Sequence, residues 1–71
     1  MFIVHPRDGR SIAHVNDAEQ VFSTVTGMKI GYLKDGVIYD RKDNRICVLA
    51  NIDGDAEAAD RLAAACAFAA R

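Results

Sequence analysis

The feature of this sequence that most constrains its fold is a threefold internal repeat within residues 1–50. Three short apolar clusters lie 18 and 16 residues apart and begin at Ile12, Ile30 and Ile46. Another apolar residue stands eight positions before each cluster, at Val4, Phe22 and Ile38. A pattern that recurs at a nearly fixed period indicates one supersecondary unit used several times.

Turn-forming residues separate the two halves of each unit and separate the units from one another. Within the units they are Asp8-Gly9, Thr26-Gly27 and Asp43-Asn44, and between the units they are Asn16-Asp17 and Asp35-Gly36. Such residues tolerate positive φ and therefore suit tight hairpins. The repeat predicts about six short strands, joined as three β-hairpins into an antiparallel meander that is curved or partly closed.

Both faces of this sheet are predicted to be apolar. Alternation of side chains puts one set on one face, namely Ile12, His14, Ile30, Tyr32, Ile46 and Val48. The opposite face collects Ala13, Val15, Gly31, Leu33, Cys47 and Leu49. An antiparallel sheet with one face in water shows polar residues there, so we expect both faces to be covered. The recurring small residue (Ala13, Gly31, Cys47) predicts close approach of a neighbouring element.

Residues 27–40, which read GMKIGYLKDGVIYD, carry the repeat in its clearest form. Across residues 2–50 this pattern resembles the repeated hairpin unit of four-fold beta flower domains, which are small bacterial proteins. The chain departs from that pattern at His14, where the pattern has tyrosine, and in the third unit, which lacks a turn glycine. The resemblance implies a β-hairpin repeat. Because the activity of that family is unassigned, the resemblance transfers no catalytic residue.

Residues 55–70 are predicted to form one helix, because nine of these residues are alanine, the best helix former. Asp53 or Gly54 is the expected cap. No residue from Leu62 to Ala70 is polar, and a helix that is apolar all round is buried all round. One face of the sheet covers one apolar stripe of the helix. A single domain of 71 residues has few residues left to cover the second stripe. We therefore expect a homo-oligomer or a protein partner, with an interface at Leu62, Ala63, Cys66, Ala67, Phe68 and Ala70.

Composition argues against several classes of protein. Nine Lys and Arg against ten Asp and Glu give a net charge of −1, whereas nucleic-acid binders show a basic excess. The longest apolar stretch is far shorter than the roughly 20 residues that span a bilayer. With no signal peptide visible and two cysteines, we expect a cytoplasmic protein with reduced thiols that binds neither nucleic acid nor membranes.

Candidate chemical residues fit structural roles better than catalytic ones. His5, His14, Cys47 and Cys66 lack the spacing of a zinc site, so no metal and no cofactor are expected. Phe22, Tyr32 and Tyr39 are assigned to the sheet core rather than to a base-stacking platform. Arg41, Lys42 and Arg45 are candidate partner contacts, although the acids between them favour a solvated hairpin tip.

The leading interpretation is a small non-catalytic protein-interaction module that self-associates through its C-terminal helix. No nucleophile motif, phosphate loop or dinucleotide fingerprint is present, so an enzyme is not expected. One alternative is a phage or mobile-element inhibitor that binds and masks a bacterial defence complex. A second is a small-ligand-binding or catalytic domain with its site near His14, Tyr32 and Cys47.

Overall fold

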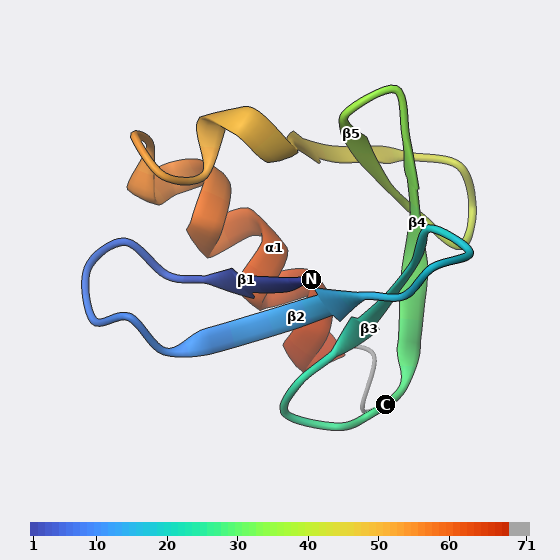
Figure 1. Ribbon diagram of the computed structural model, residues 1–71, viewed down its shortest axis with the longest axis horizontal. Helices are drawn as coiled ribbons and strands as arrows, with labels where there is room; N and C mark the ends of the chain where they lie inside the picture. Colours follow the sequence, from blue (N-terminus) through green and yellow to red (C-terminus); the bar gives the residue numbers. More distant parts are fainter. Residues whose placement is uncertain (69–71) are drawn as a thin grey trace.

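The computed structural model describes residues 1–68, with the side chains of residues 1–67. Within this range the chain forms a six-stranded antiparallel sheet followed by a short 3-10 turn and one helix (Figure 1). The elements are β1 Phe2–Val4, β2 Ser11–Val15, β3 Gln20–Ser23, β4 Lys29–Lys34, β5 Val37–Asp40, β6 Arg45–Val48, η1 Leu49–Asn51 and α1 Ala56–Phe68. Strands pair in sequence order from β1 to β6. The predicted α+β meander of three hairpins with a C-terminal helix is confirmed.

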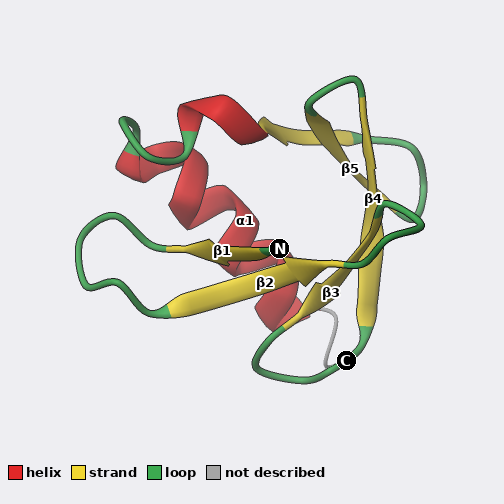
Figure 2. Ribbon diagram, viewed as in Figure 1, coloured by secondary structure: helices red, strands yellow, loops and turns green. Residues whose placement is uncertain are grey.

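Each hairpin carries one extra isoleucine at the same place. Between β1 and β2 the pairing steps from Ile3 opposite Ala13 to Val4 opposite Ser11, which leaves Ile12 without a partner residue. The same step in the pairing leaves Ile30 of β4 and Ile46 of β6 without a partner residue. These are β-bulges, which bend a strand and increase its twist. The sequence repeat is therefore a repeat of one bent hairpin, and the sheet curls into a half-barrel (Figure 2).

The core lies between the concave face of the sheet and α1, which contacts β2, β3 and β6. Ile12 and Ile30 are each 4% exposed and belong to this core. The predicted alternation, which put them on the face opposite Ala13, is wrong at these positions. Two residues of a bulged strand oppose one residue of its partner, so the alternation is interrupted there.

The recurring small residue has a clear cause at Gly31. A Cβ atom built on Gly31 would overlap the backbone carbonyl oxygen of Tyr39 in the adjacent strand β5. Close approach is therefore confirmed at this position, and the approaching element is the next strand of the same sheet. A larger residue would force these two strands apart.

The three hairpin loops are built alike. Each loop within a repeat unit begins with a residue whose side chain accepts a hydrogen bond from a backbone N–H of the loop. These residues are His5, Ser23 and Asp40, and the distances are 3.2, 3.2 and 2.8 Å, respectively. The third loop is one residue shorter, because the N–H of Asp43 bonds the carbonyl of Asp40 three residues back. Tyr39, and not Ile38 as predicted, is consequently the structural equivalent of Val4 and Phe22.

Aromatic residues occupy the convex face of the sheet. His14 stands opposite Phe2 on one side and Phe22 on the other, and Tyr32 stands opposite Tyr39. The assignment of Phe22, Tyr32 and Tyr39 to the core is wrong. Their strand neighbours Val21, Leu33 and Ile38 lie in the core on the concave side or pack against it, so these three rings point the other way and are only half-buried.

Helix α1 turns one stripe toward the sheet. Ala59 and Leu62 are 0% exposed and Cys66 is 1% exposed, whereas Ala64 and Ala67 on the opposite side are exposed. The sheet thus covers one stripe of the helix, as expected. The cap is Asp55 and not Asp53 or Gly54, since the helix begins at Ala56 and Oδ1 of Asp55 accepts the N–H of Glu57 at 2.9 Å.

Candidate interaction surfaces

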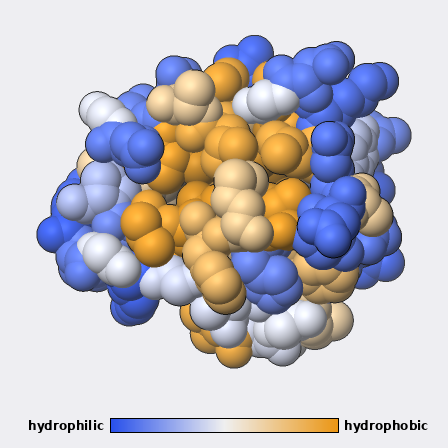
Figure 3. Space-filling view, in the orientation of Figure 1, coloured by the Kyte–Doolittle hydropathy of each residue, from blue (hydrophilic) through white to orange (hydrophobic). Residues whose placement is uncertain are grey.

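An apolar groove lies along β1, between this strand and η1. It has a volume of about 250 Å³ and is lined by Met1, Phe2, Ile3, Val4, Leu49, Ala50, Ile52 and Asp53. We call it the β1 groove. All but one of these residues are apolar, and Figure 3 shows apolar surface gathered in the middle of this face, around the N-terminus. A surface of this kind is typical of a site that another chain covers.

Two of the three side chains of β1 are exposed, as is that of Met1 just before it, whereas Ile3 is buried in the core. Phe2 is 72% exposed, Met1 59% and Val4 42%. In the part of the chain that the structure describes, the other large exposed apolar residues are Val25 and Met28, in and beside the loop between β3 and β4. The large exposed apolar residues of the described chain therefore lie in two places, at and just before β1 and in the loop between β3 and β4.

Strand β1 is also an edge of the sheet, with no strand on its other side among residues 1–68. Every second residue of an edge strand turns its N–H and C=O groups away from the sheet. Proteins commonly protect such an edge with proline or with a charged residue, lysine above all. Strand β1 has neither within Phe2–Val4. The edge therefore offers free backbone groups next to apolar side chains.

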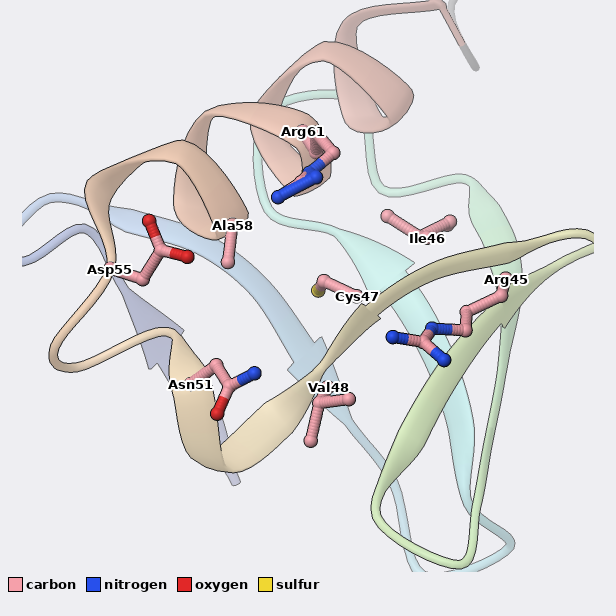
Figure 4. A pocket seen from close by; sticks show the side chains of 8 residues that line it. All are labelled: Arg45, Ile46, Cys47, Val48, Asn51, Asp55, Ala58 and Arg61. Carbon is pink, nitrogen blue, oxygen red and sulfur yellow. The ribbon is translucent and has the colours of Figure 1, made fainter.

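A second groove lies at the opposite edge of the sheet, between β6 and α1 (Figure 4). Its volume is about 310 Å³, and its lining residues are Arg45, Ile46, Cys47, Val48, Asn51, Asp55, Ala58 and Arg61. We call it the β6 groove. In Figure 4 the guanidinium groups of Arg45 and Arg61 lie on opposite sides of the Cys47 side chain, and the Asn51 amide lies on a third side.

The β6 groove carries a surplus of positive charge. Neither Arg45 nor Arg61 forms an ion pair within the described residues. The carboxylate in the lining, Asp55, accepts the Glu57 N–H at the start of the helix. Burial raises the pKa of the Cys47 thiol, while the charges of Arg61 and Arg45 act to lower it. The thiol is therefore a neutral floor beneath two cations.

The convex face carries two rows of rings that pack against one another. His14 and Phe22 stack with centroids 5.3 Å apart and planes 13° apart, and Tyr32 and Tyr39 stack at 5.3 Å and 20°. The Tyr32 hydroxyl donates to Oδ1 of Asp43 at 2.6 Å, and this hydrogen bond raises the pKa of Tyr32 to about 12. The rings of each pair therefore pack against one another across neighbouring strands.

The residues predicted to form an interface on the helix are divided by the structure. Leu62 and Cys66 fill the core of the chain itself, Ala63 is half-buried beside that core, and Ala67 is exposed. The side chain of Phe68 and all of Ala70 lie outside the described residues. Of the predicted set, Ala67 is therefore the residue that the structure presents openly to a second molecule.

The three candidate partner contacts are also divided. Arg45 lines the β6 groove, whereas Arg41 and Lys42 lie exposed on the loop between β5 and β6. Within that loop the N–H of Lys42 donates to Oδ1 of Asp40 at 2.8 Å. The interpretation of the hairpin tip as a solvated turn thus agrees with the position of Arg41 and Lys42.

The alternative site near His14, Tyr32 and Cys47 is wrong as a single site. His14 and Tyr32 are on the convex face, while Cys47 is 5% exposed and belongs to the core on the concave side. No group of three His, Cys, Asp or Glu side chains able to hold a metal ion is found in the described part of the chain. No helix within residues 1–68 has both the length and the apolar character to cross a bilayer.

Sequence reasoning missed the β1 groove. The signal was available, because the first strand of an open meander is an edge, and Phe2, Ile3 and Val4 bear no charge. The β6 groove had no such signal, since Arg45 and Arg61 meet only through the packing of α1 on β6.

No protein family, curated protein or solved structure matches this chain. The resemblance to beta flower domains stays a prediction.

Proposed function

We propose that this protein is a small non-catalytic protein-interaction module that self-associates. The observation that carries the proposal is the β1 edge, where Phe2 is 72% exposed and Val4 42%. Because Met1 and Val15 exchange both of their backbone hydrogen bonds, the N–H and C=O groups of Phe2 turn away from β2 toward this edge. Removing the side chain of a phenylalanine from water stabilises by roughly 1.5–3 kcal/mol. A second molecule that covers both residues gains this contribution and satisfies the backbone groups of the edge.

A second copy of the chain fits this edge well. When two β1 strands pair antiparallel across a twofold axis, each strand sees the same residues that it presents, as a closed dimer interface requires. The pairing joins the two sheets and covers part of the β1 groove of each copy. Because Phe2–Val4 is uncharged, no like charges oppose each other in such a pair.

The sequence-based proposal placed self-association on the C-terminal helix. Over the described part of α1 the exposed apolar residues are the alanines Ala64 and Ala67, and alanine offers much less apolar area than phenylalanine or valine. We therefore propose β1 as the main interface, with the exposed side of α1 as the competing location.

The test is light scattering coupled to size-exclusion chromatography over about a hundredfold dilution, because the population of a dimer depends on concentration. The variants are Phe2→Lys and Val4→Lys. Their matched controls are Val25→Lys and Met28→Lys, which replace apolar residues of similar exposure at 78% and 47%. We expect a concentration-dependent oligomer for the wild type and both controls, and monomers for both β1 variants.

Two outcomes contradict this proposal. A wild type that is monomeric at every concentration excludes self-association and directs attention to a foreign protein partner. An oligomer that persists in Phe2→Lys and Val4→Lys, but is lost in Ala64→Asp or Ala67→Asp, assigns the interface to α1.

A further inference from the structure

The β6 groove combines three properties that point to one kind of ligand. Two guanidinium groups from different elements, Arg45 on β6 and Arg61 on α1, lie around a common space (Figure 4). The floor of that space, made by Cys47 and Ala58, is uncharged and buried. The wall is a sheet edge, because β6 has no further strand beside it within residues 1–68.

The charge balance of the groove favours an anion. Of its lining residues two are cationic and one, Asp55, is anionic. The Asp55 carboxylate is held by the Glu57 N–H at 2.9 Å, and the structure shows no ion pair between it and either arginine among the described residues. Arginine binds carboxylates through two parallel hydrogen bonds, which makes the free guanidinium groups suitable for that partner.

The wall of the groove favours an extended chain over a small free anion. Along β6 the pairing with β5 joins Ile38 to Cys47 and Val37 to Val48. Since the N–H of Leu49 bonds Gly36, alternation turns the backbone groups of Val48 away from β5 and toward the open edge. An extended peptide that adds to this edge forms main-chain hydrogen bonds, and its alternate side chains enter the adjacent groove.

We propose that the β6 groove binds an extended acidic peptide segment of a partner protein, which pairs with the open edge of β6 and places a carboxylate between Arg45 and Arg61. The apolar surface of Cys47, Val48 and Ala58 receives the aliphatic stem of that acidic side chain. This site lies on the opposite edge of the sheet from β1, so it does not depend on self-association through β1.

The test uses a fluorescent peptide of alternating valine and glutamate, about eight residues long, which matches the length of a strand. A peptide of alternating valine and glutamine is the neutral control. Binding is measured by fluorescence anisotropy, and the site is located by amide chemical-shift changes in the wild-type protein. We expect shifts at Cys47, Val48 and Arg61, and weaker binding at high salt.

Variants decide whether the two arginines recognise the carboxylate. Arg45→Gln and Arg61→Gln each weaken binding of the glutamate peptide by about tenfold, because a charge-assisted hydrogen bond is lost. Arg41→Gln is the matched control, since Arg41 is exposed on the neighbouring loop and does not line the groove. It is expected to bind as the wild type does. Thermal melting of each variant confirms that it is folded.

Several results would overturn the proposal. Equal binding of the glutamine peptide shows edge pairing without recognition of charge. Binding of inorganic phosphate alone with the same shifts shows a site for small anions, and preferential binding of oligothymidine shows a nucleic-acid site. Absence of shifts in the groove removes the site altogether. The Phe2→Lys protein is tested in parallel, so that a failure of the β1 interface and a failure of the β6 groove are read separately.

Discussion

His5 and Asp60 are joined by a hydrogen bond of 2.8 Å between Nε2 and Oδ1, across 55 residues of sequence. The side chain of His5 is 5% exposed, and its other nitrogen, Nδ1, accepts the backbone N–H of Arg7 at 3.2 Å. Since Nδ1 is an acceptor, the proton is on Nε2, which donates to the carboxylate. This contact fastens the first hairpin loop to helix α1.

The contact between His5 and Asp60 makes part of the free energy of unfolding depend on pH in the acid range. The hydrogen bond from His5 holds the pKa of Asp60 below its ordinary value, with a smaller contribution from the charge of Arg7. A carboxylate with a lowered pKa in the folded state stabilises above the ordinary pKa, and this contribution is lost as pH falls through the lowered value. As pH falls below about 4, the ordinary pKa of an aspartate, we expect Asp60→Asn to lose less stability than the wild type.

Urea unfolding at a series of pH values measures this difference. The matched control is Asp17→Asn, because the described structure gives the Asp17 carboxylate no hydrogen bond. Asp8 and Asp40 also have lowered pKa values, held by backbone hydrogen bonds, so some acid sensitivity remains in every variant. Identical pH profiles for Asp60→Asn and the wild type would contradict the role of the His5 contact.

Gly31 is predicted to be the least replaceable glycine among those described. Gly31→Ala puts a methyl group where the Tyr39 carbonyl oxygen lies, and such overpacking against backbone lowers the free energy of unfolding by about 3 kcal/mol. Gly54→Ala is the control, since nothing lies within 4 Å of a Cβ at that position, and its change stays within about 0.5 kcal/mol. Chemical denaturation followed by circular dichroism distinguishes them; equal stabilities would refute the close approach.

Tyr32 is expected to ionise well above the ordinary value for tyrosine. The hydrogen bond to Asp43 raises its pKa from 10.0 to about 12, so this bond stabilises the fold below pH 10 and is lost as pH rises through about 12. Tyr39→Phe leaves Tyr32 as the single tyrosine, whose ionisation is followed by ultraviolet absorbance. Adding Asp43→Asn is predicted to bring the pKa back toward 10. An unchanged titration would show that Asp43 is not the cause.

The backbone at Glu19 is strained, and replacing this residue is predicted to stabilise the protein. Its φ is 60°, a left-handed conformation that costs a residue with a Cβ about 1–2 kcal/mol. Glu19→Gly relieves this strain but adds freedom to the unfolded chain, so a net gain of about 0.5–1 kcal/mol is expected. Asp17→Gly, two residues earlier in the same loop and not at positive φ, is predicted to destabilise. Equilibrium unfolding in urea measures both, and a loss of stability in Glu19→Gly would contradict the strain.

The sequence predicted the hairpins but not their bends. Turn residues such as Asp35-Gly36 and the spacing of Ile12, Ile30 and Ile46 located the strands. An isoleucine that is inserted as a bulge looks the same in sequence as one that alternates regularly, so the faces of the sheet were assigned wrongly at Ile12 and Ile30. The shift in the third hairpin was hidden because a three-residue loop replaces a loop of four, with Asp43 at positive φ where Gly9 and Gly27 stand in the others.

One of the two candidate surfaces could be predicted from the sequence, and the other could not. A meander has its first and last strands at its edges, so β1 and its uncharged residues were accessible to prediction. The meeting of Arg45 and Arg61 depends on where α1 crosses the concave face and on the direction of each side chain. Local pattern does not determine either of these, because they follow from the packing of Leu62 and Cys66 against the whole sheet.

The repeated bulge has a consequence for the edges of the sheet. Each of the three hairpins carries one bulge, and the sheet that they form curls only as far as a half-barrel. Additional hairpins of the same kind would extend the curl until the first and last strands met, and a closed barrel has no free edge. The number of repeats therefore sets whether the sheet keeps free edges: with three units it has two, one beside an apolar groove and one beside a groove with two arginines.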